Sequence, residues 1–165
     1  MADPQHYGRL LQVFDAFLGP WEDRVAAVLP ADAHGWLRQR SRRPFVRDDL
    51  RALGLPRLAA PAQEATLSSA AEAWGSLYVL EGSALGGQLI TRAVAAHGFS
   101  PESGAAYFHG WGAATGAMWR EFRALLEEHL PEPDDIRSAC AGAVATFDAL
   151  SASFEAHVHE RAATA

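Results

Sequence analysis

Apolar residues recur every three or four positions through almost the whole chain, and this spacing restricts the fold more than any other feature. The clearest stripe runs through residues 7–28, and comparable stripes follow in 68–97, in 113–130 and from 133 to the end. Such spacing places apolar side chains on one face of an α-helix. No segment alternates between apolar and polar residues with period two, as a half-buried strand does. The pattern therefore predicts an all-α fold.

Glycine and proline divide these stripes into separate helices. Gly19 and Pro20 interrupt the first stripe without changing its phase, so we expect a kink there and not a break. Two short helices are expected over 32–40 and 45–53, followed by a loop over 56–66 that is rich in Pro, Ala, Arg and Gln. The linkers are short, and this favours a compact helical bundle.

Length and composition exclude several classes of protein. A chain of 165 residues is long enough for one self-sufficient core, so we expect a single domain over 1–165. The net charge of −6 argues against nucleic-acid binding. The single cysteine, Cys140, excludes a disulfide scaffold and a cysteine-based zinc site. There is no apolar run of about 18 residues and no signal-like leader, which predicts a cytoplasmic protein without a membrane span.

Most residues that could carry chemistry have a structural interpretation. Cys140 lies on the apolar stripe of the last helix, which favours a packing role. A di-iron site is not expected, because the chain has no pair of Glu-x-x-His motifs. Four histidines lie in the last turns of expected helices, where a cation complements the helix dipole: His97, His129, His157 and His159. Five arginines near the two short helices are interpreted as a solvated face and not as an anion site: Arg38, Arg40, Arg42, Arg43 and Arg47.

The central helical segment, 73–90, does not fit a purely structural interpretation. Its interior contains Gly75, Gly82, Gly86 and Gly87. Each interior glycine costs about 1 kcal/mol relative to alanine, so the four together give up roughly 4 kcal/mol of a typical stability of 5–15 kcal/mol. The first three are seven and four residues apart and share one face. Gly87 flanks this face, and the paired glycines favour a bend.

Two explanations for this bare strip compete. A neighbouring helix could pack closely against it, or a broad planar ligand could lie against the backbone itself. The hydroxyl of Ser83 beside the strip and the clustering of the glycines favour the ligand. Glu81 lies in the same apolar stretch, where a carboxylate needs a partner. The candidate partners are Arg92, Arg120 and Arg123.

The run from Tyr78 to Gln88, YVLEGSALGGQ, resembles the distal-helix signature of haem oxygenases, in the form found in the bacterial branch associated with bacteriophytochromes. Supporting matches follow in the same order as in that family, within 107–119 and 143–147. The likeness extends over nearly the whole chain. The distal run is quite specific, and the other matches support it.

The resemblance implies a fold and an activity. Haem oxygenases are all-helical and hold haem between a proximal helix, whose histidine ligates the iron, and a long, kinked, glycine-rich distal helix. They use O2 and electrons from an external reductase to open haem to biliverdin, with release of CO and Fe2+. Haem is therefore both substrate and cofactor. The expected partners are haem and biliverdin, an electron-donor reductase and a bacteriophytochrome that accepts biliverdin.

The resemblance also implies roles for individual residues. Gly82, Ser83 and Gly86 correspond to the catalytic part of the distal helix, and Gly87 joins them in contacting haem. Ser83 stands where many relatives have an aspartate that orders distal water. The haem propionates are expected to bind Arg120 and Arg123, because the guanidinium fork suits a carboxylate.

The iron ligand is the one part of the family pattern that has no match. In the family, the proximal histidine lies on a helix ahead of the one that Tyr7–Val28 resembles, and His6 does not match its position. The metal ligand is therefore left unassigned, and this form of the chain is expected to lack the proximal-histidine helix. Two alternatives to an active haem oxygenase stay open: a non-catalytic haem or bilin binder, and a helical interaction module whose glycine face packs a partner helix.

Overall fold

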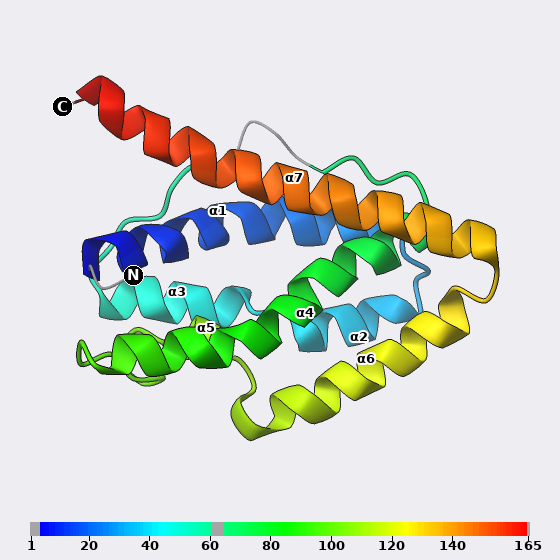
Figure 1. Ribbon diagram of the computed structural model, residues 1–165, viewed down its shortest axis with the longest axis horizontal. Coiled ribbons are helices and arrows are strands. Elements are labelled where there is room, and N and C mark those ends of the chain that lie inside the picture. The colour runs from blue at the N-terminus through cyan, green and yellow to red at the C-terminus, as the bar shows by residue number, and fades with distance from the viewer. Residues whose placement is uncertain (1–3, 61–64, 165) are drawn as a thin grey trace.

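The computed structural model describes residues 4–60 and 65–164, with side chains described to residue 156. The described residues form helices and no strand, which confirms the expected all-α fold (Figure 1). In chain order the helices are α1 (Pro4–Val28), α2 (Ala33–Arg40), α3 (Arg43–Ala52), α4 (Ala70–Ala95), α5 (Ala106–His109), the 3₁₀ turn η1 (Gly112–Ala114), α6 (Thr115–His129) and α7 (Pro133–Thr164).

Local sequence signals account for the helix boundaries. The Ser69 side chain caps α4 by accepting a hydrogen bond from the backbone N–H of Glu72 at 3.2 Å. The Glu72 carboxylate in turn accepts from the backbone N–H of Ser68 at 2.7 Å. Gly54 follows α3 with a φ of 64°, a conformation that favours glycine. The helix α1 continues through Pro20 as one element.

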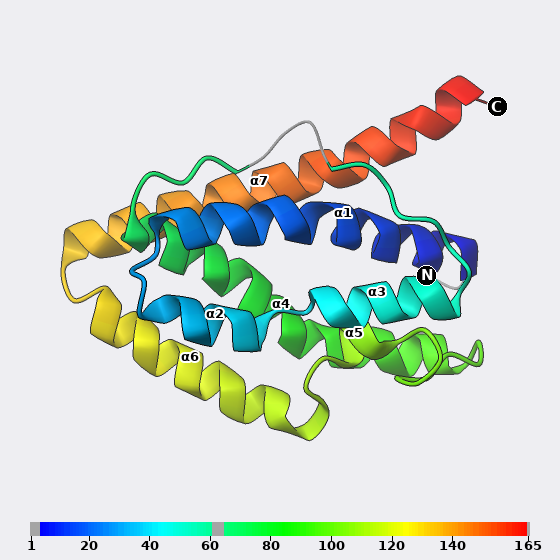
Figure 2. The same cartoon turned by 180° about the vertical axis from the view of Figure 1, so that it is seen from behind.

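The helix α4 runs through the middle of the bundle. In Figures 1 and 2, α7 and α1 lie on one side of α4, with α3 between α1 and the C-terminal half of α4, and α2 and α6 lie on the other side. The core between these helices is formed by buried apolar side chains of α1, α3 and α4, among them Leu11, Val25, Leu50, Trp74 and Leu77. Both views show that α4 changes direction near its middle.

The first part of the helix α7 buries a different face from the one expected. Three residues of the expected packing stripe lie outside: Cys140 is exposed, and Val144 and Phe147 are 61% and 62% exposed. Further along the same stripe, Leu150 packs against the core and the Phe154 ring contacts that of Phe14, as expected. The buried positions are small or hydroxylic residues: Ala139, Gly142, Thr146, Ala149 and Ser153. The assignment of Cys140 to packing was therefore wrong. The physical reason is the close crossing of α7 over α4, where only small side chains fit.

No helix in the described part of the chain combines the length and the hydropathy that a membrane span requires.

Candidate functional site

The four glycines of α4 fall into two pairs with different surroundings. A Cβ at Gly75 would overlap the backbone carbonyl of Ala139 in α7, and a Cβ at Gly87 would overlap the carbonyl of Phe108 in α5. Across the α4–α7 crossing, a Cβ at Gly142 would likewise overlap the carbonyl of Glu72. Gly75 and Gly87 therefore allow close helix packing within the chain, as the packing explanation predicts.

Gly82 and Gly86 lie on the open side of α4. A Cβ at Gly86 would meet no atom within 4 Å, and one at Gly82 would meet only the ring of Trp119, at 3.6 Å. No tertiary contact within the described residues explains why these two positions lack a side chain. They leave a stretch of helix backbone uncovered.

Gly82 lines a groove of about 670 Å³, and Gly86 is exposed one turn further along α4, outside the groove lining. The groove lies between three helices and is lined from α4 by Tyr78, Val79, Gly82 and Leu85, from α6 by Trp119, and from α7 by Ala143, Val144, Phe147 and Asp148. Its size lies within the range of small-molecule sites, and its walls are predominantly apolar, as in such sites. The rings of Tyr78 and Trp119 lie 5.3 Å apart on its wall. The groove therefore suits a broad, mostly apolar ligand.

Behind the groove, Arg40 joins α4 to α6. Its guanidinium donates to the Glu81 carboxylate at 3.0 Å and to the Glu121 carboxylate at 2.8 Å. It also donates to the backbone carbonyl of Met118 at 3.3 Å. Burial raises the pKa of Glu81, and the nearby positive charge of Arg40 opposes this shift.

The structure corrects two expectations here. The partner of Glu81 is Arg40, and not Arg92, Arg120 or Arg123. The arginine run is also not simply a solvated face, because Arg40 and Arg42 are only 7% and 6% exposed. Both lie at the short link between α2 and α3, from which their side chains reach α4. Sequence reasoning missed them because a charge run in a linker is normally solvated, and no signal in the sequence marks these two as buried.

Arg42 contacts α4 at its middle. Its Nη2 donates to the carbonyl of Leu80 at 2.6 Å and to the hydroxyl of Ser83 at 2.9 Å. The Ser83 hydroxyl in turn donates to the Leu80 carbonyl at 2.7 Å. The guanidinium lies 4.9 Å from the ring centre of Tyr107, a cation–π contact. Arg42 therefore holds the hydroxyl that flanks the glycine strip.

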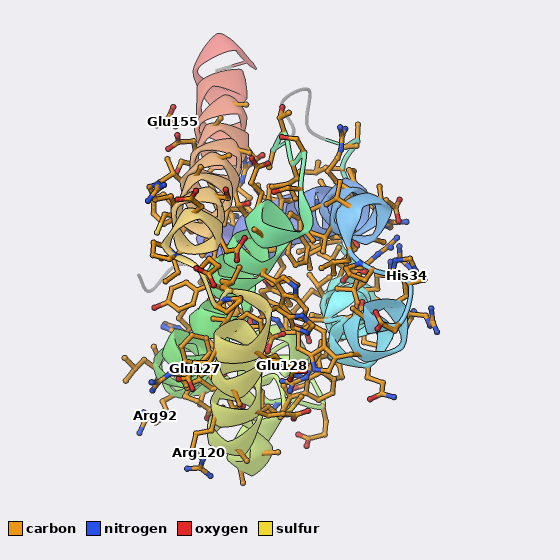
Figure 3. The ribbon with its side chains drawn as sticks, turned by 90° about the vertical axis from the view of Figure 1, so that its right-hand side faces the viewer. His34, Arg92, Arg120, Glu127, Glu128 and Glu155 are labelled. Atoms are coloured by element: carbon orange, nitrogen blue, oxygen red, sulfur yellow. The ribbon has the colours of Figure 1, made fainter. Side chains whose placement is uncertain are left out.

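The other expected site residues are distributed around the groove. Ser83 is exposed beside Gly82, whereas Gly87 is buried and faces α5. Arg120 and Arg123 are exposed on α6, the helix that also carries Trp119. Figure 3 shows Arg120 projecting outward at the lower left, on the same side of the view as Arg92. Neither of these two α6 arginines lines the groove.

None of the groove-lining residues is a histidine or a cysteine. The described residues also contain no group of three or more His, Cys, Asp or Glu that could hold a metal ion. The described histidines have other surroundings: the His129 ring stacks on Trp74 with centres 4.5 Å apart, and His34 lies at the outer surface of α2, where it bonds the Leu29 carbonyl (Figure 3). The residues that line the groove therefore provide no imidazole or thiolate for a metal ion.

Comparison with known proteins agrees with the geometry. The family described as "Heme oxygenase" matches residues 54–156, a range that contains every residue lining the groove. A protein named heme oxygenase from Xanthomonas campestris pv. campestris (strain 8004) is 37% identical over 143 residues, which cover 87% of this chain and 81% of that protein. The chain belongs to the heme oxygenase family.

Proposed function

We propose that this chain is a haem oxygenase, which opens haem to biliverdin with release of CO and Fe2+. The observation that carries the proposal is the bare backbone at Gly82, which lines an apolar groove, and at Gly86 one turn beyond it; neither glycine has a packing role within the described residues. A planar macrocycle can approach a helix this closely only where side chains are missing. Family membership and the 37% identical heme oxygenase support the same reaction.

The residues of the groove perform binding and orientation. Trp119, Val144 and Phe147 offer apolar surface to the macrocycle and exclude water from its face. The backbone of Gly82 and Gly86 fixes how closely α4 approaches the ring. Bound haem supplies the iron centre for O2 chemistry and is itself the carbon skeleton that is opened, with electrons from an external reductase.

Charged residues at the rim are proposed to orient the haem. Arg120 and Arg123 on α6 hold the propionates, and each can present a two-pronged guanidinium to a carboxylate. Both side chains are exposed in the structure, so their contribution is expected to weaken as salt rises. Ser83 provides a hydroxyl at the distal face, where many relatives have an aspartate.

The finer assignment follows the sequence resemblance. We propose that residues 1–165 act as one haem oxygenase-like domain of the bacteriophytochrome-associated type. A cytoplasmic reductase would supply its electrons, and a bacteriophytochrome would accept its biliverdin. This assignment is supported by the distal run YVLEGSALGGQ at 78–88.

A second candidate function is a non-catalytic haem or bilin binder. The absence of histidine and cysteine among the groove-lining residues favours it, because haem iron is normally held by His, Cys, Met or Tyr. Tyr78 is the one groove residue of these four types, and it extends from α4, the same helix as the glycine strip. We propose that the iron ligand does not come from the residues that line the groove.

One experiment separates the candidates. Purified protein is titrated with haemin, and binding is followed by the shift of the Soret band. The complex is then supplied with O2 and a reductant, with and without added imidazole. Conversion to a product that absorbs in the red supports the oxygenase, and a need for imidazole would show that the iron lacks a ligand from the chain. A Soret shift without conversion in either condition supports the binder. The absence of any Soret shift contradicts both.

A further inference from the structure

Arg42 occupies an unusual position in the bundle. Its side chain leaves the link between α2 and α3, is 6% exposed, and ends against α4 between Leu80 and Ser83. Gly82, the first of the two glycines without a packing role, lies between those two residues. The function proposed above assigns no role to this arginine.

The contacts of Arg42 alter the hydrogen bonding of α4. The Leu80 carbonyl accepts side-chain hydrogen bonds from both Arg42, at 2.6 Å, and Ser83, at 2.7 Å. A carbonyl has two lone pairs, so two side-chain donors compete with the backbone N–H four residues ahead. Helices bend where side chains insert into their hydrogen-bond ladder. This competition occurs where Figures 1 and 2 show α4 changing direction, near its middle.

Gly82 and Gly86 make this part of α4 easy to deform, but they do not set the direction of the bend. A glycine permits many backbone conformations, whereas a guanidinium anchored in the core pulls one carbonyl to one side. Arg42 is anchored by its contact with the Tyr107 ring, a side chain that is 1% exposed. This one-sided contact of Arg42 with α4 therefore favours a single direction of bending.

The charge of Arg42 is also distinctive. Arg40 is paired with two carboxylates, whereas Arg42 contacts a carbonyl, a hydroxyl and an aromatic ring and forms no ion pair with another described residue. Buried charges are normally paired. The carboxylate that feels the charge of Arg42 is Glu81, whose pKa this charge lowers against the effect of burial. Because Glu81 is already paired with Arg40, the positive charge of Arg42 is only partly compensated at the middle of α4.

We propose that Arg42 is a positioning residue for the haem site: it sets the bend of α4, holds the Ser83 hydroxyl beside Gly82, and places a positive charge against the middle of α4, the helix whose Gly82 lines the groove. The proposal rests on the haem oxygenase function proposed above. It extends that function, because it names a residue outside the distal helix as the one that fixes where the glycine backbone meets the macrocycle.

The test compares Arg42→Met with Arg43→Met. Arg43 is the matched control: it is adjacent in the chain and pairs with Glu22 at 3.5 Å, on α1 and away from the groove. Amide hydrogen exchange of the haem-free proteins reports on the bend. Faster exchange in 80–88 of Arg42→Met, with no change there in Arg43→Met, is expected. Equal exchange in both variants would overturn the role in the bend, whether or not the protein binds haem.

The haem-loaded proteins test the positioning and the charge. In Arg42→Met, the proportion of minor biliverdin isomers is expected to rise about tenfold, because the macrocycle is held less uniquely. The reduction potential of bound haem is expected to fall, because a cation that disfavours the ferric state has been removed. Arg42→Lys keeps the charge but not the planar fork, so it should restore the potential without restoring the isomer ratio.

The proposal would be contradicted on the haem-loaded protein if Arg42→Met and Arg43→Met gave the same ratio of biliverdin isomers and the same reduction potential of bound haem. If Arg42→Met does not fold, Arg42→Lys and Ser83→Ala are measured in its place. Each removes part of the contact, and each is expected to shift the isomer ratio in the same direction. A wild-type ratio of biliverdin isomers in both of these variants would overturn the proposal. If the wild-type chain binds no haem, the proposed function fails. The amide hydrogen exchange experiment then still tests whether Arg42 sets the bend of α4.

Discussion

Gly75 and Gly87 lie against the backbone of neighbouring helices, whereas Gly82 lines an open groove and Gly86 is exposed one turn beyond it. All four residues belong to one helix, and the same loss of helix propensity applies to each. At the first pair, the loss is offset by close packing of α7 and α5 on α4. At the second pair, nothing in the described residues offsets it. An unexplained loss of stability in one part of a helix is what a ligand site is expected to show.

The largest effect among the four glycines is expected from Gly75→Ala. The added Cβ would overlap the Ala139 carbonyl, and a backbone group cannot move aside as a flexible side chain can. The free energy of unfolding should fall by about 3 kcal/mol, measured by chemical denaturation. The matched control is Gly116→Ala in α6, where an added Cβ meets no atom within 4 Å. Equal stability of the two variants would contradict the packing role of Gly75.

The opposite result is expected from Gly86→Ala. Its Cβ enters open space, so the free energy of unfolding should rise by about 0.5–1 kcal/mol through helix propensity. The same methyl group would separate the macrocycle from the backbone, and the dissociation constant for haem should rise about tenfold, equivalent to 1.4 kcal/mol. Gly116→Ala should show the gain in stability alone. Unchanged haem affinity in Gly86→Ala would remove the main support for the groove as the haem site.

A third comparison uses two phenylalanines. Phe147 lines the groove and is 62% exposed, whereas Phe122 on α6 is fully buried. Phe147→Ala should change the free energy of unfolding by less than about 0.5 kcal/mol but weaken haem binding several-fold. Phe122→Ala should cost about 3–5 kcal/mol of stability. A large loss of stability in Phe147→Ala would mean that the groove face contributes to the core.

The smallest effect concerns the packed end of α4, where Gly87 meets α5. The Asp49 carboxylate holds α5 by accepting hydrogen bonds from the backbone N–H groups of Ala106 and Tyr107, each at 2.8 Å. Burial raises the pKa of Asp49 from 3.8 to about 6, although these hydrogen bonds oppose the shift. Because its pKa is raised in the folded state, folding favours the protonated Asp49 carboxyl. The stability gained in this way is fully present below about pH 3.8 and is lost as pH rises through about 6.

Between pH 4 and pH 6, the stability of the wild-type chain should therefore decline relative to that of Asp49→Asn, by about 1 kcal/mol. Denaturation at a series of pH values measures this difference. Parallel pH profiles for the two proteins would show that Asp49 does not titrate differently in the folded and unfolded states. Haem affinity at fixed pH should be equal in both, because Asp49 lies outside the groove lining.

Much of the fold could be predicted from the sequence, because helix periodicity and capping are local properties. The start of α4 after Ser69 and the end of α6 before Pro131 follow from adjacent residues. The face that α7 buries could not be predicted in this way. A stripe containing Val144 and Phe147 is typical of a core-facing surface, and only the close crossing at Gly75 shows that the small residues of α7 face inward.

The candidate site shows the same division. The glycine spacing made Gly82 and Gly86 candidates for the site, since four interior glycines are costly wherever the helix lies. It could not separate them from Gly75 and Gly87, because spacing along a helix does not reveal which neighbour covers each face. The role of Arg40 as the partner of Glu81 was also beyond reach, because the two residues are 41 positions apart.

By itself, the sequence determined that the chain is helical, that one helix contains more glycine than its own stability favours, and that its distal run resembles that of haem oxygenases. The tertiary structure alone decided which glycines pack against other helices and which do not, which face of α7 is buried, and that Arg42 reaches the middle of α4. The physical reason is that helix propensity and periodicity act between residues close in the chain. Burial and ion pairing depend on segments that only folding brings together.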